Sequence, residues 1–373
     1  MPADIIDEEM DAVRRVGAPV HRLVGVPFNG CENRHVLRYP RQATFHPLKY
    51  LAGVAKVCHD SGVSFFRDSP VESVSQDGGV VAVKTARATI RAQHAVVATN
   101  SSISDRFNIH TKTAPYRTYV MTFEIKRGAL PDALYWDTEE PYHYVRLQPG
   151  PDRVDYVLVG GEDHKSGQAD DADERFRRLE TWARELVSGL GEETHRWSGQ
   201  VLDTVDYAGF IGRDPGKNNI YVAMGDSGQG LTHGVAGAML NAALILGEDH
   251  AWQKLYDPGR IPLKAAKNFV MENVTAVKNF VEYVAPGELG SLDELGRGKG
   301  AIIRRGVEKL AAYRDDKGTL HLNSATCSHV GCHLHWNSFE TCWDCPCHGS
   351  MFNVDGVPIN APAVGRLNAL EES

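Results

Sequence analysis

The chain has 373 residues, of which 42% are hydrophobic and 24% charged, so it is long enough for two domains and has the composition of an ordinary soluble protein. Its net charge of −8 argues against a nucleic acid as partner. The longest apolar stretch, residues 235–247, is too short and too rich in alanine and glycine to span a bilayer, and the N-terminus lacks the apolar region of a secretory signal. We therefore expect a cytoplasmic protein without a membrane span.

The first part of the chain combines helical and strand patterns. Residues 6–17 are typical of a helix ended by Gly17, and residues 47–61 place apolar side chains at helical spacing before the stop at Gly62. Short β-rich runs then follow, separated by polar turns. They predict strands at 63–66, 71–74, 80–85 and 88–99.

The middle of the chain predicts a sheet followed by a helix. Residues 113–163 are rich in aromatic and β-branched side chains, which indicates antiparallel strands. Residues 171–191 have the spacing of an amphipathic helix. Its apolar face is predicted to contain Phe176, Leu179, Trp182, Ala183 and Leu186.

A glycine-rich turn stands out in residues 218–247. A hydrophobic strand runs into Gly225, Gly228 and Gly230, and a helix is predicted to begin near Thr232. Such a turn lets the backbone approach a ligand closely, and a helix N-terminus offers free N–H groups and a partial positive charge. The pattern suits an anion or an electron-rich carbonyl, although many α/β proteins contain a similar turn without a ligand.

Residues 284–301 have the glycine and charge content of a linker.

A cysteine-rich segment follows at residues 326–352. It contains five of the seven cysteines and four histidines. Cys327 and His329 form one pair and Cys345 and His348 form another, so two loops can converge on one metal site. Tetrahedral zinc takes two Cys and two His, and so does a Rieske [2Fe-2S] cluster. The additional cysteine beside each pair favours the cluster, because a zinc ribbon does not need it.

Residues 285–373 resemble a Rieske domain of the disulfide-containing type, with CSHVGC and CPCHGS as its two boxes. The resemblance implies that Cys327, His329, Cys345 and His348 ligate the cluster and that Cys332 and Cys347 form a disulfide. Phe352 stands where high-potential members often have Tyr, which should lower the potential because one hydrogen bond to a ligand sulfur is lost. We expect the remaining candidates of the segment, Cys342, His333 and His335, to be surface residues that lie close to the metal without binding it.

Residues 1–260 resemble the later two thirds of the D-amino-acid oxidase and glycine oxidase superfamily of FAD-dependent oxidoreductases. The similar stretches are QATFHPLKYL, VESV, HAVVATN, VGGEDHKSGQ, RWSGQ, DYAGFIG and GDSGQGLTHG, in that order along the chain. The resemblance implies FAD as a cofactor. The residues it places beside FAD are Val71, Ala98, Thr99, Asn100, Gly225, Asp226, Gly228, Gly230, Leu231 and Thr232.

The resemblance is incomplete at the N-terminus. The family opens with a strand, a G-x-G-x-x-G turn and a helix that hold the FAD pyrophosphate, and this chain has no such sequence. We therefore expect weak FAD binding or none by this chain alone, with exposed apolar surface. Either the sequence is truncated or its start mis-assigned, or a separate chain supplies the missing part.

Together these observations predict an incomplete FAD-binding α/β domain with an antiparallel substrate-type sheet (1–260), a helical connector (261–284) and a small all-β Rieske domain (285–373). The implied activity is oxidation of a C–N bond in an amine or amino acid, with the cluster passing electrons to an acceptor. Near the substrate we would place Tyr144 and the catalytic candidates His46, Lys49, Arg146 and His233. An electron-transfer protein with a non-catalytic flavin remnant is the alternative. A Rieske oxygenase fits less well because no facial-triad spacing is present.

Overall fold

The computed structural model describes residues 3–104, 109–261 and 286–371. The chain forms two compact units, and each is described by itself. One contains residues 1–64, 118–163 and 171–199, and the other contains 65–117, 164–170 and 200–373. The prediction of a helical connector at 261–284 lies outside the described residues, apart from Ile261.

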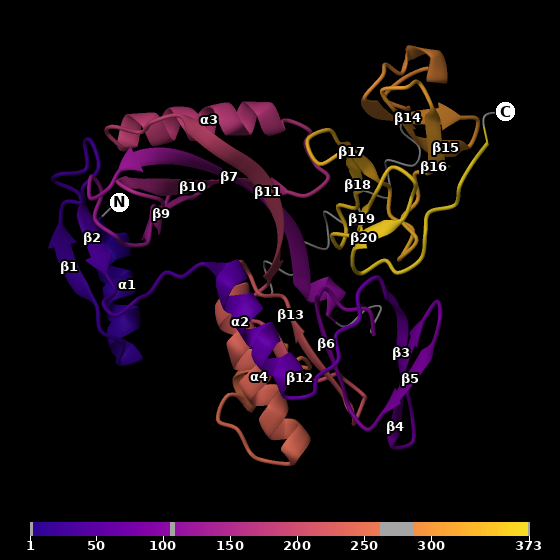
Figure 1. Ribbon diagram of the computed structural model, residues 1–373, viewed down its shortest axis with the longest axis horizontal. Coiled ribbons are helices and arrows are strands. Elements are labelled where there is room, and N and C mark those ends of the chain that lie inside the picture. The colour runs from indigo at the N-terminus through magenta and orange to yellow at the C-terminus, as the bar shows by residue number, and fades with distance from the viewer. Residues whose placement is uncertain (1–2, 105–108, 262–285, 372–373) are drawn as a thin grey trace. The chain divides into compact units, whose positions relative to one another are not determined.

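The first unit is built on a sheet of long and short strands, which lie in the order β11-β7-β10-β9-β8 (Figure 1). The strands are β7 (Thr113–Lys126), β8 (Tyr135–Trp136), β9 (His143–Pro149), β10 (Val154–Lys165) and β11 (Glu193–Thr204), and some of their ends extend into the second unit. β9 pairs antiparallel with both β8 and β10, as the aromatic and β-branched pattern predicts. The core of this sheet includes Phe123, Val157 and Val159, which are fully buried.

Helix α3 (Ala172–Leu186) packs on this sheet through its apolar face. Phe176, Leu179 and Ala183 are buried, and the Phe176 ring meets Tyr119 of β7 edge to face at 5.1 Å. The helix is shorter than predicted because Val187 already has extended backbone. The apolar face was therefore predicted correctly, whereas the C-terminal boundary at residue 191 was wrong.

The N-terminal elements of this unit are α1 (Ala3–Arg15), β1 (His21–Val24), β2 (His35–Arg38) and α2 (Pro47–Asp60). Two features explain where α2 begins: it has Pro in its first turn, and the side chain of His46 accepts a hydrogen bond from the backbone N–H of Lys49. No residue of α2 is buried in the described structure, although Leu48, Leu51 and Val54 share a face. This face is thus an exposed apolar surface.

The second unit starts with residues 65–117. The strand predicted at 63–66 is absent, and Phe65 and Phe66 are exposed. β3 (Val71–Asp77), β4 (Val80–Thr85) and β5 (Thr89–Ala92) form an antiparallel sheet. The run 88–99, predicted as one strand, breaks after Ala92, so that β6 (Ala95–Asn100) joins a different sheet.

That second sheet has the order β12-β13-β6. β12 (Phe210–Arg213) pairs antiparallel with β13 (Ile220–Met224), β13 pairs parallel with β6, and β6 is an edge strand. Helix α4 (Gly230–Leu246) covers it through Leu240 and Leu244, which pack with Ile211 and Tyr221. A short helix, α5 (Gln253–Tyr256), follows. The glycine-rich turn lies between β13 and α4, as predicted.

The C-terminal region, residues 286–371, is all-β apart from short turns of 3-10 helix such as Leu292–Glu294. One antiparallel sheet contains β14 (Lys299–Arg305), β15 (Glu308–Arg314) and β16 (Leu320–Ser324). The other contains β17 (His335–Asn337), β18 (Cys342–Asp344), β19 (Met351–Phe352) and β20 (Pro358–Asn360), also antiparallel. The predicted fold class, an α/β domain with an antiparallel sheet followed by a small β domain, is confirmed. Within the described ranges no helix is long and apolar enough to cross a bilayer.

Candidate functional site

Two loops of the C-terminal region have the same backbone construction. In the first, the N–H of Gly331 donates to the carbonyl of Cys327 at 3.0 Å, and in the second the N–H of Gly349 donates to the carbonyl of Cys345 at 3.0 Å. Both glycines have a left-handed φ, of 79° and 80°, which glycine adopts without strain. Equivalent backbone turns therefore present one Cys and one His from each loop.

The four predicted ligands lie together at the ends of these loops. The Cys327 and Cys345 thiols are buried and hydrogen-bonded to each other. This bond, together with donation from the backbone N–H groups of His329 and Val330 and from Ser350, lowers the pKa of Cys327 to about 7. The imidazoles of His329 and His348 meet at 5.2 Å between ring centroids. Two buried sulfurs and two imidazoles form the donor set that a Rieske cluster requires.

His348 supplies an independent test of whether the residues fit a metal centre. Its Nδ1 atom is buried and has no hydrogen-bond partner among the described residues. Burial, and the imidazoles of His110 and His329 nearby, lower its pKa to about 3, so that the ring is neutral. A neutral imidazole with an unsatisfied nitrogen is the form that ligates a metal. The residues therefore fit a [2Fe-2S] cluster, and the assignment of the four ligands remains a prediction.

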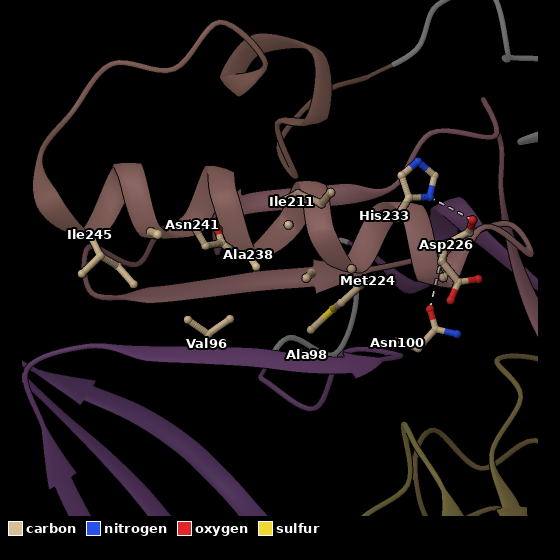
Figure 2. A pocket seen from close by; sticks show the side chains of 15 residues that line it. Val96, Ala98, Asn100, Ile211, Met224, Asp226, His233, Ala238, Asn241 and Ile245 are labelled. Carbon is tan, nitrogen blue, oxygen red and sulfur yellow. Dashed lines mark hydrogen bonds between the residues drawn. The ribbon is translucent and has the colours of Figure 1, made fainter. Parts of the chain in front are cut away.

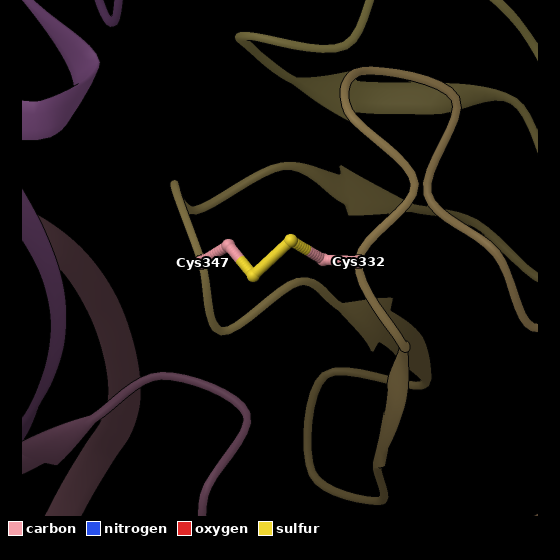
Figure 3. Close-up of a disulfide and its surroundings, with 2 residues drawn as sticks. All are labelled: Cys332 and Cys347. Atoms are coloured by element: carbon pink, nitrogen blue, oxygen red, sulfur yellow. A yellow bond between two sulfur atoms is a disulfide. The ribbon is translucent and has the colours of Figure 1, made fainter. Parts of the chain in front are cut away.

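A disulfide joins the two loops (Figure 3). It links Cys332 to Cys347, the pair that the sequence resemblance implied. The sulfurs of Cys332, Cys345 and Cys347 all lie within 4.8 Å of one another, but those of the disulfide are already bonded, so only Cys345 of this group can act as a thiolate ligand. Cys342 is buried and donates to Asp344 at 3.5 Å, and burial raises the pKa of its thiol. The predicted surface position is wrong for Cys342 and His333, which are 1% and 3% exposed because both pack inside the β domain, and their non-ligand role remains a prediction.

The second site surrounds the glycine-rich turn. Asn100, at the end of β6, accepts a hydrogen bond through Oδ1 from the N–H group of Gly225 at 3.0 Å. The same atom accepts from the N–H group of Asp226 at 3.3 Å (Figure 2). This ties the ends of the parallel strands β6 and β13 together. A pocket of about 480 Å³ opens between these strands and α4. Of the predicted FAD neighbours, Ala98, Asn100, Asp226 and Gly230 line it.

The pocket combines apolar walls with the N-terminal turn of α4. The first turn of α4 lines it, and the cap residue Gln229 makes no side-chain hydrogen bond to that turn. At Gly230 a Cβ atom would come within 2.7 Å of the Asp226 carboxylate, so a larger side chain would displace that carboxylate and narrow the pocket. An uncapped helix N-terminus suits an electron-rich carbonyl such as those of a flavin ring. These residues fit a flavin at this end of the sheet.

The other predicted FAD neighbours do not line the pocket. Thr99 donates to the carbonyl of Ser101, Leu231 is exposed at the start of α4, and Val71 pairs with Thr85 inside the sheet of β3 to β5. Gly225 and Gly228 shape the turn through positive φ angles, as glycine readily does. Thr232 donates its backbone N–H to Gln229. All of these remain predictions as cofactor contacts.

The catalytic candidates have structural partners. His46 caps α2 by accepting from the N–H of Lys49, and Arg146 on β9 donates to the carbonyl of Phe45 at 3.4 Å. His233 lines the pocket at α4, where its Nδ1 atom lies 3.0 Å from the carbonyl oxygen of Asp226. His46, Lys49 and Arg146 belong to the first unit and His233 to the second. No catalytic role is assigned by these contacts.

The sequence pointed to Tyr144 but not to Thr118, Asp163 or His110. In the first unit Thr118, Tyr144 and Asp163 form a half-buried polar cluster, in which burial raises the pKa of Asp163 to about 6 and that of Tyr144 to about 12. In the second unit His110 is buried against both predicted histidine ligands. Only Tyr144 carried a signal, because it lies in a strand that we associated with the substrate. His110 lies in a segment without a motif.

Known proteins support both halves of the chain. Residues 4–244 match the family model "FAD dependent oxidoreductase", and residues 286–371 match "Rieske [2Fe-2S] domain". A Bacillus subtilis protein named for a Rieske 2Fe-2S iron-sulfur centre, YhfW, is 26% identical over 333 residues, which is 88% of this chain and 65% of that protein. A Haemophilus influenzae protein named as an oxidoreductase, OrdL, is 31% identical over 217 residues, covering 55% of this chain and 48% of that protein. The chain thus spans between about half and two thirds of the length of these relatives.

Solved structures show the same fold at low identity. Glycine oxidase from Geobacillus kaustophilus superimposes with a TM-score of 0.57 at 16% identity, over 70% of this chain and 72% of that one. L-proline dehydrogenase from P. horikoshii gives a TM-score of 0.53 at 16% identity, over 68% and 72%. With a family model that covers more than half of its length, the chain belongs to the FAD-dependent oxidoreductase family and carries a C-terminal Rieske [2Fe-2S] domain.

Proposed function

We propose that this chain is the flavin- and cluster-bearing part of an oxidoreductase that oxidises a C–N bond of an amine or amino acid and releases the electrons through its Rieske cluster. The observation that carries the proposal is that one compact unit contains both the β6–β13–α4 pocket and the complete Rieske donor set. The structural neighbours named glycine oxidase and L-proline dehydrogenase support an amino-acid substrate, since both names refer to C–N oxidation.

FAD, when bound, would accept a hydride equivalent from the carbon that bears the nitrogen while the nitrogen loses a proton, leaving an imine that water hydrolyses. The protein's own residues position it. Asn100 holds the turn at Gly225 and Asp226 in place, and the uncapped first turn of α4 faces the pocket. Because a flavin takes up two electrons at once and a Rieske cluster one, the cluster would serve as a stepwise outlet to an acceptor.

The substrate side of the proposal rests on the first unit. Arg146 could bind a substrate carboxylate, because a guanidinium donates two parallel hydrogen bonds to it and its one observed bond, to Phe45, is long. The Thr118–Tyr144–Asp163 cluster offers a carboxyl group whose pKa of about 6 allows it to hold or release a proton near neutral pH.

The proposal is tested by anaerobic titration of the purified chain after incubation with FAD. Glycine and proline are compared with glycolate and lactate, which present a C–O bond instead. Although the missing G-x-G-x-x-G turn predicts weak FAD binding by this chain alone, the proposal requires that flavin absorbance remain with the protein on a desalting column and bleach with the amino acids only. Bleaching with the hydroxy acids alone would contradict the substrate class, and absence of bound flavin would favour the alternative, an electron-transfer protein with a scaffold domain.

A matched pair of glycine variants separates flavin binding from folding. Gly230→Val places a branched side chain on the pocket wall and should abolish flavin retention while leaving the iron content unchanged. Gly199→Ala is the control, because a Cβ atom there meets nothing within 4 Å. If Gly230→Val retained flavin as the control does, the pocket would not be the flavin site.

A further inference from the structure

His110 brings a third imidazole to the predicted cluster ligands. It belongs to a short 3-10 helix, His110–Lys112, just before β7, and is only 2% exposed. Its ring lies 4.7 Å from that of His329 and 5.4 Å from that of His348, in both cases edge to face. These residues belong to one compact unit. The imidazole side of the cluster site therefore meets the oxidoreductase domain of the same chain.

A buried ion pair anchors the same contact. Nη2 of Arg117, on β7, donates to both carboxylate oxygens of Asp344, at 2.9 and 3.2 Å, and both side chains are 3% exposed. Asp344 directly precedes the predicted ligand Cys345 and also accepts from Nδ2 of Asn337 at 2.9 Å. A buried charge without its partner is costly, so this pair disfavours separation of the two surfaces.

Further contacts surround the second ligand loop. Nε2 of Gln200 donates to the carbonyl of Gly349 at 2.7 Å. A Cβ atom at Gly349 would come within 2.6 Å of that same amide nitrogen, so the loop approaches Gln200 as closely as its backbone allows. Asp170 accepts from the N–H and hydroxyl of Ser338, at 2.8 and 2.7 Å. We call His110, Arg117, Asp170 and Gln200 the docking face.

The docking face is connected to the glycine-rich turn through buried residues. The hydroxyl of Thr113 donates to the carbonyl of His110 at 3.3 Å, and Thr113 is buried. A Cβ atom at Gly225 would lie 3.5 Å from Cγ2 of Thr113. Thr113 thus lies next to the turn beside the flavin pocket on one side and bonds to the backbone of His110 on the other.

We propose that the docking face is an intramolecular electron-transfer interface, in which the cluster-bearing loops face the flavin domain of their own chain and His110 is the residue that positions the two histidine ligands. The flavin end of this inference rests on the function proposed above, whereas the docking itself does not. Oxidation of one C–N bond removes two electrons and two protons. The protons go to solvent, and the cluster takes the electrons one at a time and passes each to an external one-electron acceptor, for which ferricyanide serves as the probe.

Docking is tested by disulfide trapping in the full chain. The pair Asp170→Cys with Ser338→Cys replaces two side chains that touch, whereas Asp170→Cys with Val307→Cys is the control, because Val307 is 95% exposed in the β14–β15 turn. We expect the first pair to cross-link roughly a hundredfold faster than the control under mild oxidation, because contact gives a high effective concentration. Equal rates would overturn the docking, whether or not FAD binds.

The role of His110 is tested by His110→Ala and His110→Gln, with His250→Ala as control because the His250 ring contacts Trp252 instead. We expect His110→Ala to change the nitrogen couplings in the EPR spectrum of the reduced cluster, His110→Gln to recover them in part, and the control to leave them unchanged. With FAD bound, cluster reduction by photoreduced flavin should slow roughly tenfold or more. Unchanged couplings in His110→Ala would overturn the positioning role. If His110→Ala changed the couplings but the parent chain bound no flavin, the positioning role would be supported and only the proposed function would be contradicted.

Discussion

The ion pair between Arg117 and Asp344 gives the most quantitative prediction. Both side chains are 3% exposed, and the guanidinium reaches both carboxylate oxygens. Removing one partner of such a buried pair costs about 3–5 kcal/mol, because the other charge stays buried without compensation. The domains can relieve this cost by separating, so Arg117→Met should shift the docking equilibrium against the docked state by about two orders of magnitude or more.

The matched double variant distinguishes charge burial from simple loss of packing. In Arg117→Met with Asp344→Asn neither member of the buried pair is charged, and Nδ2 of Asn337 can still donate to the amide oxygen at position 344. Glu340, whose Oε1 lies 3.7 Å from Nη1 of Arg117, keeps its charge, but its side chain is 32% exposed and remains in contact with water. The double variant should therefore dock much more strongly than either single variant, with a coupling energy of about 2 kcal/mol or more.

The assay is the rate at which the Asp170→Cys and Ser338→Cys pair cross-links in each background of this double-mutant cycle. Iron content and the visible circular dichroism of the cluster are measured in parallel, because Asp344 is adjacent to a predicted ligand. Additive effects of the two substitutions, or a single variant that cross-links at the rate of the parent pair, would refute the reasoning.

Three other predictions concern the cluster and the substrate-side sheet. Cys345→Ser should lose the cluster, whereas Cys342→Ser should retain it. The iron content of each purified variant tests this, and loss of iron from both variants would contradict the predicted ligand set. Replacing both Cys332 and Cys347 by Ser should lower the free energy of unfolding, measured by denaturant titration, by about 2–4 kcal/mol. If this decrease were smaller than that of the control Cys58→Ser, a structural role of the disulfide would be contradicted. Burial raises the pKa of Asp163 from 3.8 to about 6, so the folded state favours the protonated carboxyl. This preference contributes about 3 kcal/mol to the free energy of unfolding. The contribution is complete below pH 3.8 and disappears as the pH rises through 6. Asp163→Asn should remove that slope, and an unchanged pH profile of unfolding would show that the carboxyl is not perturbed.

Features encoded by short sequence patterns were predicted well. The two Cys–His boxes gave the disulfide, because each box is a local turn whose glycine, Gly331 or Gly349, fixes the backbone. The strand-to-helix turn at Gly225 and the apolar face of α3 follow from equally local signals. For the two boxes, the turn at Gly225 and the helix, the residues that determine the local structure lie within one turn or one helix of each other, whereas the disulfide pairing came from the family resemblance of the two boxes.

Features that depend on distant partners were not predicted. Arg117 and Asp344 are 227 positions apart, and nothing in the sequence near either residue shows that the other will neutralise it. His110 has no local motif, and its place beside the cluster site depends on how the C-terminal region packs. Likewise, the apolar spacing of α2 predicted a helix correctly but could not show that Leu48 and Leu51 would remain exposed.

The central claim is that this chain carries a Rieske [2Fe-2S] cluster held by Cys327, His329, Cys345 and His348. The most direct measurement is low-temperature EPR with nitrogen hyperfine spectroscopy on the dithionite-reduced chain, together with iron and zinc analysis of the same sample. We predict the signal of a reduced [2Fe-2S] cluster coupled to two imidazole nitrogens, and its loss in His348→Ala. Stoichiometric zinc with no EPR signal, or a cluster without nitrogen coupling, would contradict the claim.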